Sequence, residues 1–551
     1  MITDETYKWV KKLINAKITE ISDDNYDKLA KDYFQKEKTD WYENNERMQL
    51  SLIIKESDFW KLIRKFSMPR GEKKRLFDFS NFIFPAFEPQ HLNELSIKGK
   101  SYDNFWKKED NKVFTYSVNF NEAIFLKKSI FTDTVFQANI EFVNAKFNDG
   151  LIIGNCEFNK NIIFRKSELE SLEIYESTFQ KEMTFKDSEC YGKLSVGTTN
   201  FKGFPSFYYS KFHQKAIFGK SEFSGHACRF NDSIFLEDVE FFECNFGNNT
   251  EFLAVTFSKK ADFIRPEFHD KVSFNQSQFK GVTIFDLPIF KGKADFSYCY
   301  FEDVNFKEVN TFWSRRKLNY TKPPELYFKD VFFNSKAFIK NTDLSALELD
   351  NCDVSNITFS RCVWNDDKNR LKLVNELPHK NIETENRLKL ANHHPSKKAA
   401  VENLINKLRD SENHYRQLKK NFDTTKSWEL SGKAYVSEME MRKQRLWLEG
   451  KLYQWFIYKF YDVFGGYTQD FKKPIVSLVG LILVFSGLYF FIDYDISRAI
   501  QRGVKGALPY MQITTGTAFE GYWLILRNLE LVLGGTFLAF FILALRKRFK
   551  Q

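Results

Sequence analysis

The chain has 551 residues, 61 of them phenylalanine, and a formal net charge of +10 at pH 7. This length exceeds that of one ordinary domain, so we expect two or more domains. The seven cysteines show no paired spacing, which argues against a disulfide-framed secreted domain and fits a reducing compartment. The first residues are charged throughout, so we expect no secretory signal peptide.

The first 76 residues mix charged and apolar positions, as in WYENNERMQLSLIIKESDFWKLIRKF, and we expect them to be mainly helical. The stretch FDFSNFIFPAF, which begins at Phe77, then marks the start of a β region. The repeats that follow would expose an open end, and stacked repeats need a polar cap there. We therefore expect residues 1–76 to form a helical N-terminal cap rather than an independent binding domain.

A phenylalanine repeat dominates the next part of the chain. Between Ala261 and Phe285, phenylalanines stand at 263, 268, 274, 279 and 285, so the gaps alternate between five and six residues. Helical steps of 100° would place successive rings about 120–140° apart. A straight strand would send odd and even spacings to opposite faces. The spacing is therefore typical of a chain that turns a corner every five or six residues.

Such corners predict a coil with four short sides, each of which sends one large and one small residue inward. Small or branched residues such as Ala261 and Thr283 lie two positions before the phenylalanines. Stacked coils would pair their backbones about 4.8 Å apart, and about nine coils are expected. In alternate units we expect the sixth residue to bulge at the corner.

This pattern resembles the pentapeptide-repeat family, whose unit is a small residue, then Asp or Asn, then Leu or Phe, then two more residues. The sequence ADF occurs at Ala261–Phe263 and again at Ala294–Phe296, and TDLSALELDNCDVSNITFSRCVW keeps a strict spacing of five. The similarity covers roughly residues 114–312 and 333–364. It implies a mainly β fold, a right-handed quadrilateral β-helix, which we assign to residues 77–364.

The composition changes after Trp364, and residues 365–473 are expected to form a basic, helical juxtamembrane region. From Lys368 to Lys473 there are 22 basic and 13 acidic residues, whereas residues 114–312 hold 22 and 27. Apolar residues at 401, 404, 405 and 408 predict an amphipathic helix. A second helix is expected to run from about Trp428 through ELSGKAYVSEMEMRKQRLWLEGKLYQW.

Residues 474–551 are expected to form a hairpin of two transmembrane helices. Pro474–Ile492 are 19 residues without a charge, about 28 Å of helix, which is enough to cross a bilayer core. The second segment, Leu529–Leu545, carries one charge, Glu530. Basic residues precede the first segment and follow the second, so we expect both termini and the β-helix to be cytoplasmic.

The C-terminal part resembles that of membrane-bound bacterial pentapeptide proteins with a two-span, channel-like tail, on the stretches GGYTQDFKKP and GGTFLAFFILALRKRFK. The resemblance implies a location in the bacterial inner membrane. In relatives that look like potassium channels, a filter similar to Thr-Val-Gly-Tyr-Gly lies between the spans. Here Thr514, Thr515 and Gly516 are the filter candidates, but no Gly-Tyr-Gly follows, which argues against potassium selectivity of the known kind.

Three further residues of the two apolar segments are candidates for function. Ionisable residues inside a span mark ion pathways by default, which makes Glu530 a candidate. Glu530 also lies near the predicted edge, three residues after Arg527, and an interfacial ion pair with Arg527 is the account we expect. Gly535 and Ala539 have the spacing of small residues that let helices approach closely, which would suit a contact in a homo-oligomer.

No catalytic, cofactor-binding or metal-binding motif stands out in the sequence. It contains no G-x-x-x-x-G-K-[ST], no H-E-x-x-H and no G-x-S-x-G. Five cysteines occupy the small inward position of the repeat, so we expect core spacers rather than metal ligands. They are Cys156, Cys244, Cys299, Cys352 and Cys362. We therefore expect a protein that is not an enzyme and that carries no cofactor.

Three functions remain open. The first is a membrane-anchored scaffold whose β-helix binds another protein, because solenoids present extended surfaces. The second is an ion channel or membrane-permeabilising effector with a two-span, pore-like region. The third is DNA mimicry towards topoisomerases, implied by resemblance to soluble family members, which needs a more acidic rod than this one. We expect the first, with membrane lipid and an unidentified protein as partners, self-association left open, and no nucleic acid.

Overall fold

The computed structural model describes most of the chain after residue 117. The described residues are 76–79, 83–84, 87, 112–114, 117–310, 323–367, 370–374, 376, 395–508 and 522–549. The helical cap expected for residues 1–76 lies outside them, apart from Leu76. The chain divides into two compact units, one formed by Met1–Glu348 with Phe359–Val363 and the other by Leu349–Thr358 with Trp364–Gln551.

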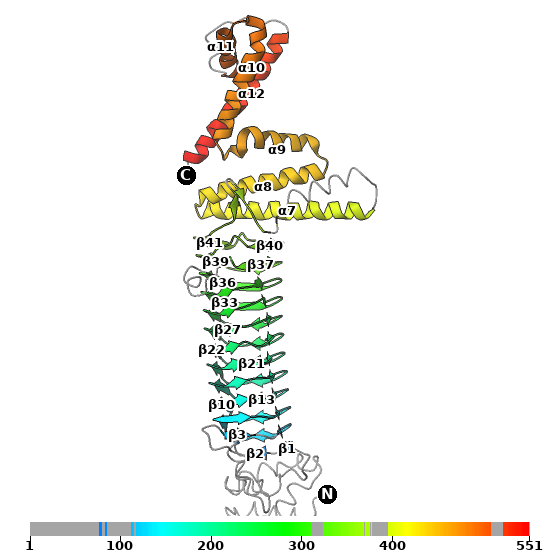
Figure 1. Cartoon of the computed structure of the whole chain (residues 1–551), viewed down its shortest axis with the longest axis vertical. Coiled ribbons are helices and arrows are strands. Elements are labelled where there is room, and N and C mark those ends of the chain that lie inside the picture. Colours follow the sequence, from blue (N-terminus) through cyan, green and yellow to red (C-terminus); the bar gives the residue numbers. More distant parts are fainter. Residues whose placement is uncertain are drawn as a thin grey trace, which may run out of the picture. The chain divides into compact units, whose positions relative to one another are not determined.

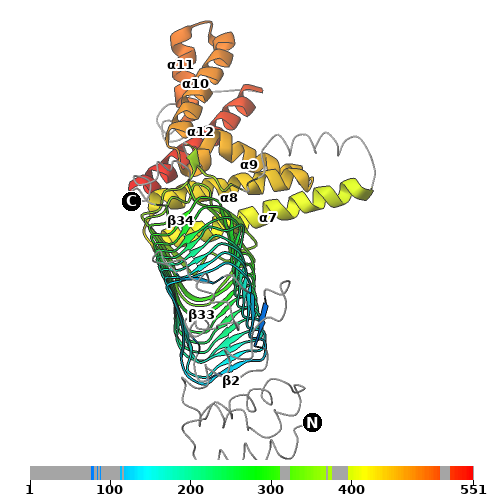
Figure 2. The same cartoon turned by 60° about the horizontal axis from the view of Figure 1, so that its bottom comes forward.

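The first unit is a β-solenoid of about eleven turns with a repeat of about 22 residues (Figure 1). Four short strands make up one turn: β6 (Ser129–Thr132), β7 (Thr134–Phe136), β8 (Ile140–Glu141) and β9 (Lys146–Phe147). The next strand, β10 (Leu151–Gly154), pairs in parallel with β6. Figure 2 shows the coils lying over one another along the solenoid. The prediction of stacked coils is confirmed.

The β region begins where the sequence predicted it, near Phe77, but the solenoid has more turns than expected. Strands β1 (Leu76–Asp78) and β2 (Ile83–Phe84) pair with β4 (Ser117–Asn119) and β5 (Ile124–Phe125), so FDFSNFIFPAF does open the β region. After residue 322, β37 (Glu325–Lys329) pairs with β35 (Lys293–Asp295). The expected number of about nine coils is wrong because it counted neither of these additions.

Phenylalanine rings fill the axis of the solenoid. The fully buried Phe263 stacks on Phe241 and Phe285, with ring centroids 5.0 and 4.6 Å away. It also meets the rings of Phe252 and Phe274 edge to face. Both arrangements are favourable for aromatic rings and contribute beyond the area they bury. The large residue of each side therefore joins its own coil to the coils before and after it.

The small residue of each unit also points inward, and in several coils a Ser or Cys at this position bonds a backbone carbonyl of the preceding coil. The hydroxyl of Ser188 donates to the carbonyl of Phe164 at 2.8 Å. Cysteine thiols do the same: Cys299 donates to Phe274 at 2.9 Å and Cys244 to Phe218 at 3.1 Å. Burial raises the pKa of Cys156 and Cys244 to about 12, so these thiols stay neutral. The interpretation of the cysteines as core spacers agrees with this geometry.

The alternation between five and six residues reflects two kinds of corner. Arg265 and Gln276, which lie in five-residue gaps, have φ values of 52° and 61°. The six-residue gaps from Phe268 to Phe274 and from Phe279 to Phe285 contain no residue with positive φ. In this stretch, a five-residue corner, here called tight, contains one residue in the left-handed conformation. A six-residue corner has one more residue and needs no positive φ.

Six α-helices form most of the described part of the second unit (Figure 1). They are α7 (Pro395–Thr424), α8 (Trp428–Leu448), α9 (Leu452–Gly465), α10 (Lys472–Asp493), α11 (Ile496–Ala507) and α12 (Tyr522–Phe549). A short antiparallel pair, β42 (Asp366–Asp367) and β43 (Arg370–Leu371), precedes them.

The sequence-based helix boundaries are wrong in one place and incomplete in another. The second expected helix, which was to run on to Trp455, ends at Leu448, because Gly450 adopts a φ of +76° that breaks the helix before α9 begins. Helix α11, which carries three basic residues, was not among the helices expected from the sequence.

Removing one ring of the ladder should destabilise the solenoid strongly. We expect Phe263→Ala to lower the free energy of unfolding by about 3–5 kcal/mol, because it leaves a cavity between four rings. Thermal unfolding followed by circular dichroism measures the effect. The control, Phe332→Ala, removes a ring that is more than half exposed and should cost much less. Equal losses in the two variants would contradict a core built on the rings.

A tight corner should be stabilised by glycine. Thr198 is an exposed, β-branched residue with a φ of 51°, a conformation that costs a non-glycine residue about 1–3 kcal/mol. We expect Thr198→Gly to raise the free energy of unfolding by about 0.5–1 kcal/mol after the entropy cost of glycine. The same change at Thr178, in β15 (Thr178–Phe179), should lower it. A melting temperature that falls in both variants would refute the strained-corner interpretation.

Candidate functional site

The solenoid surface carries no assembled chemical site within the described residues. In that part of the chain, no group of three or more His, Cys, Asp or Glu side chains is placed to hold a metal ion. The polar and apolar clusters described below lie in the second unit. They are a polar contact on α7, an ion-pair network between helices, and the apolar helices α10 and α12.

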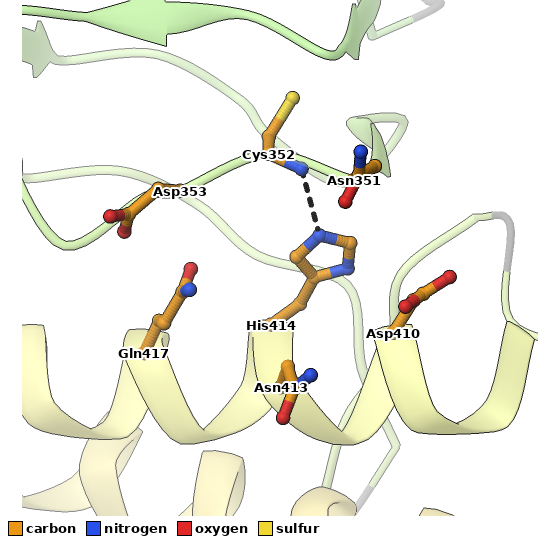
Figure 3. A pocket seen from close by; sticks show the side chains of 7 residues that line it. All are labelled: Asn351, Cys352, Asp353, Asp410, Asn413, His414 and Gln417. Carbon is orange, nitrogen blue, oxygen red and sulfur yellow. Dashed lines mark hydrogen bonds between the residues drawn. The ribbon is translucent and has the colours of Figure 1, made fainter. Parts of the chain in front are cut away.

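One face of α7 bonds the backbone of the segment Leu349–Thr358, which belongs to the same compact unit. His414 Nε2 accepts from the backbone N–H of Cys352 at 3.2 Å (Figure 3). Gln417 Oε1 accepts from the N–H of Val354 at 3.0 Å, and Asn421 Nδ2 donates to the carbonyl of Ile357. The three side chains therefore satisfy backbone groups of this segment.

A pocket of about 210 Å³ lies beside this contact. Figure 3 shows its lining, with Asn351, Cys352 and Asp353 on the segment and Asp410, Asn413, His414 and Gln417 on α7. Burial lowers the pKa of His414 to about 4, so the neutral ring can accept a hydrogen bond at pH 7. The pocket is smaller than ordinary small-molecule sites, and its imidazole already serves the backbone. We therefore regard it as part of the structural contact.

A buried ion-pair network joins α7 to α8. The carboxylate of Glu412, which is almost fully buried, pairs with Arg416 at 2.7 Å, Arg442 at 2.8 Å and Arg445 at 2.9 Å. Breaking a buried pair on one side typically costs 3–5 kcal/mol. Part of the positive charge that the sequence places in residues 365–473 is thus used inside the helical unit and is not available to an outside partner.

Helices α10 and α12 are apolar and mostly uncovered. Their windows Lys472–Phe491 and Leu524–Lys547 have mean hydropathies of 2.2 and 1.9, and 22% of each is buried. Large apolar side chains lie open, with 69% of Val476, 65% of Leu483 and 65% of Val532 exposed. By length and composition, both helices are able to cross a membrane.

The structure brings together only some of the residues that the sequence singled out. Thr514, Thr515 and Gly516 lie outside the described residues. Gly535 is half-buried and Ala539 is exposed. The close approach within this chain is made instead by Gly534, where an added Cβ would lie 2.1 Å from the carbonyl oxygen of Ala507 in α11. The proposed role of Gly535 and Ala539 between chains stays a prediction.

Glu530 lies inside the helical bundle and not at its edge. Its side chain is 0% exposed, and the hydroxyl of Tyr489 in α10 donates to Glu530 Oε2 at 2.7 Å. The expected pair with Arg527 is wrong, because the one polar partner of Glu530 among the described residues is Tyr489. The sequence alone could not reveal this contact, since 41 residues separate the two side chains.

Helix α11 runs antiparallel to α10 and completes this cluster. Ala499 packs with Phe485 and Tyr489, and further along α11 a Cβ added at Gly503 would lie 2.3 Å from Ser486 Oγ. At Gly506 an added Cβ would lie 2.0 Å from Glu530 Oε2. Glycine is therefore required where the backbone of α11 approaches the polar groups of α10 and α12.

Comparisons of the chain with protein-family models, with curated proteins and with solved structures found no match.

The contact of His414 predicts a pH dependence. Its folded pKa of about 4 lies below the value of 6.5 for a free imidazole, so the stability it contributes is complete above pH 6.5. That stability should be lost as the pH falls towards 4, by about 2–3 kcal/mol, because the unfolded chain binds the proton first. Chemical denaturation at several pH values measures the difference between the unmodified chain and His414→Gln.

The control is His226→Gln, which changes an exposed histidine of the solenoid. Subtracting the two variants removes the contribution of the many carboxylates to acid unfolding. A difference between the unmodified chain and His414→Gln that stays constant from pH 7 to pH 4 would contradict the neutral, buried imidazole.

Proposed function

We propose that this protein is a membrane-anchored pentapeptide-repeat scaffold whose β-helix presents a surface to another protein. The repeat of about 22 residues with inward phenylalanine and small residues supports the family and its right-handed, four-sided coil. In this proposal the helical unit anchors the solenoid in the membrane.

The observation that carries the proposal is the exposed apolar surface of α10 and α12. Single exposed apolar residues are ordinary, but contiguous apolar patches mark membrane or protein contacts. Helix α9 adds to the patch, since Tyr453, Phe456 and Ile457 are exposed. Aromatic and aliphatic residues next to a span are typical of the membrane interface. A bilayer covers all three surfaces at once.

Basic residues support a cytoplasmic solenoid in a bacterial inner membrane. Lys472 and Lys473 precede the uncharged stretch Pro474–Ile492, and four basic residues lie between 546 and 550. Positive residues are retained on the cytoplasmic side of a membrane. This orientation places both chain termini and the solenoid in the cytoplasm.

The solenoid is suited to binding a protein because side chains along its strands alternate between inside and outside, so about half of them form an extended outer surface. Large aromatic side chains occur on this surface, and such residues are enriched in protein interfaces. The exposed ones include Tyr175, Tyr191, Phe204, Tyr209, Tyr298 and Phe332. The proposed partner is therefore a protein, held close to the membrane surface.

A second candidate function is an ion channel or membrane-permeabilising effector, and the position of α11 favours it. This short helix follows the first apolar helix and returns along it as far as the level of Ile482 and Ser486. Irregular or interrupted segments at membrane depth occur where they are covered by protein or line a water-filled cavity. The basic residues of α11, Arg498, Arg502 and Lys505, would need such shelter.

The anchor can be tested by placing a charge on the exposed side of each apolar helix. We expect the unmodified chain to stay in the membrane fraction without detergent, and the double variant Leu483→Arg with Val532→Arg to lose much of this association. Each arginine at a helix centre costs about 2.5–3.5 kcal/mol on insertion. The control Val374→Arg, at an exposed residue before α7, should not change it. A soluble unmodified chain would refute the anchor.

Partner binding and conduction are separated by two measurements on the same preparation. Crosslinked pull-down from native membranes should recover a protein through the solenoid, and replacing Tyr209 and Tyr298 by alanine should weaken its recovery. Current recordings in planar bilayers should stay silent across voltages. Steady conductance without a recovered partner would favour the channel and overturn the scaffold.

A further inference from the structure

Glu530 is enclosed by helices of its own bundle. Its side chain is 0% exposed, its Oε2 accepts from the hydroxyl of Tyr489, and the backbone of α11 approaches the same atom at Gly506. The other carboxyl oxygen, Oε1, has no hydrogen-bond partner among the described residues. The enclosure comes from α10, α11 and α12 themselves, so it does not depend on the proposed membrane anchor.

A second buried polar atom without a partner lies on α10, close to Tyr489. Ser486, three residues before Tyr489, is buried, and its Oγ has no hydrogen-bond partner in the described part of the chain. Gly503 approaches Ser486 in the way that Gly506 approaches Glu530. Two glycines, one helical turn apart, thus hold the backbone of α11 against the unpaired groups of its neighbours.

Within the described residues, no ion pair joins a cation to the Glu530 carboxyl. Arg502 of α11 and Arg527 of α12 act electrostatically on the Tyr489 hydroxyl, but neither pairs with Glu530. A buried carboxylate with one hydrogen bond and one bare oxygen is strongly disfavoured. Protonation removes the charge and converts the bare oxygen into a hydroxyl that can donate.

We propose that Glu530 is a proton-binding site that couples protonation to the packing of α11 against α10 and α12. A proton from water forms the O–H bond on Oε1, while Tyr489 keeps its own proton and donates to Oε2. The neutral acid tolerates the close backbone of Gly506. Loss of the proton leaves a charge facing that backbone and the apolar helices, which favours separation of α11 from the carboxyl.

The proton itself is the probe in the test, and the full chain is used in detergent micelles or lipid nanodiscs. Infrared spectra recorded over a range of pH should contain a carboxylic-acid carbonyl band at neutral pH that is missing in Glu530→Gln. The control Glu429→Gln, which changes a carboxylate at the exposed start of α8, should leave this band in place. Tyr489→Phe should keep this band but move it to higher frequency, because the carbonyl oxygen Oε2 of the acid loses its hydrogen bond.

A second measurement needs no variant and so does not depend on how a variant folds. Dicyclohexylcarbodiimide adds to protonated carboxylic acids in apolar surroundings, and mass spectrometry locates the resulting acylurea. We expect Glu530 to be modified at neutral pH, the modification to fall as the pH rises, and Glu429 to stay unmodified.

A neutral-pH spectrum without a band that depends on Glu530, or equal labelling of Glu530 and Glu429, would overturn the proton site. These outcomes are distinct from failure of the anchor. A chain found in the soluble fraction with Glu530 protonated would refute the anchor and leave the proton site standing.

Discussion

The stacking of one phenylalanine ring on the next is the interaction on which the solenoid depends. The centroid distances of 4.6 and 5.0 Å on either side of Phe263 are close to the spacing at which parallel strands pair, about 4.8 Å. Rings and backbone therefore reach their favourable separations together. Each coil must then follow nearly the same path as the coil before it, which is why the repeat stays near 22 residues.

The same packing engages hydroxyl and thiol groups inside the solenoid. Several small inward residues donate a hydrogen bond to a carbonyl of the previous coil, as the hydroxyl of Ser188 and the thiol of Cys299 do. Burial raises the pKa of Cys156 and Cys244, so these inward thiols stay neutral at neutral pH. The outward side chains are the part of this unit that another molecule can contact.

The helical unit differs from the solenoid because it buries large polar and charged side chains. Glu412 is held by three arginines, and His414 and Gln417 bond strand backbone. These groups are satisfied, and they hold the helices in one arrangement. Glu530 differs, since one of its oxygens has no partner. We therefore place the capacity for regulation at this buried acid.

The repeat, the opening of the β region near Phe77, and the two apolar helices could be predicted from the sequence. These features are periodic or composed of one residue class, so a short stretch of sequence is enough to recognise each of them.

The turn count, the break at Gly450, helix α11 and the partner of Glu530 could not be predicted from the sequence. They depend on contacts such as Tyr489 with Glu530, between residues far apart in the chain. The sequence by itself determined which side chains face inward along the solenoid, because local spacing sets that direction. Only the tertiary structure decided which polar groups meet inside the helical unit, because helix packing brings together residues that no local pattern relates.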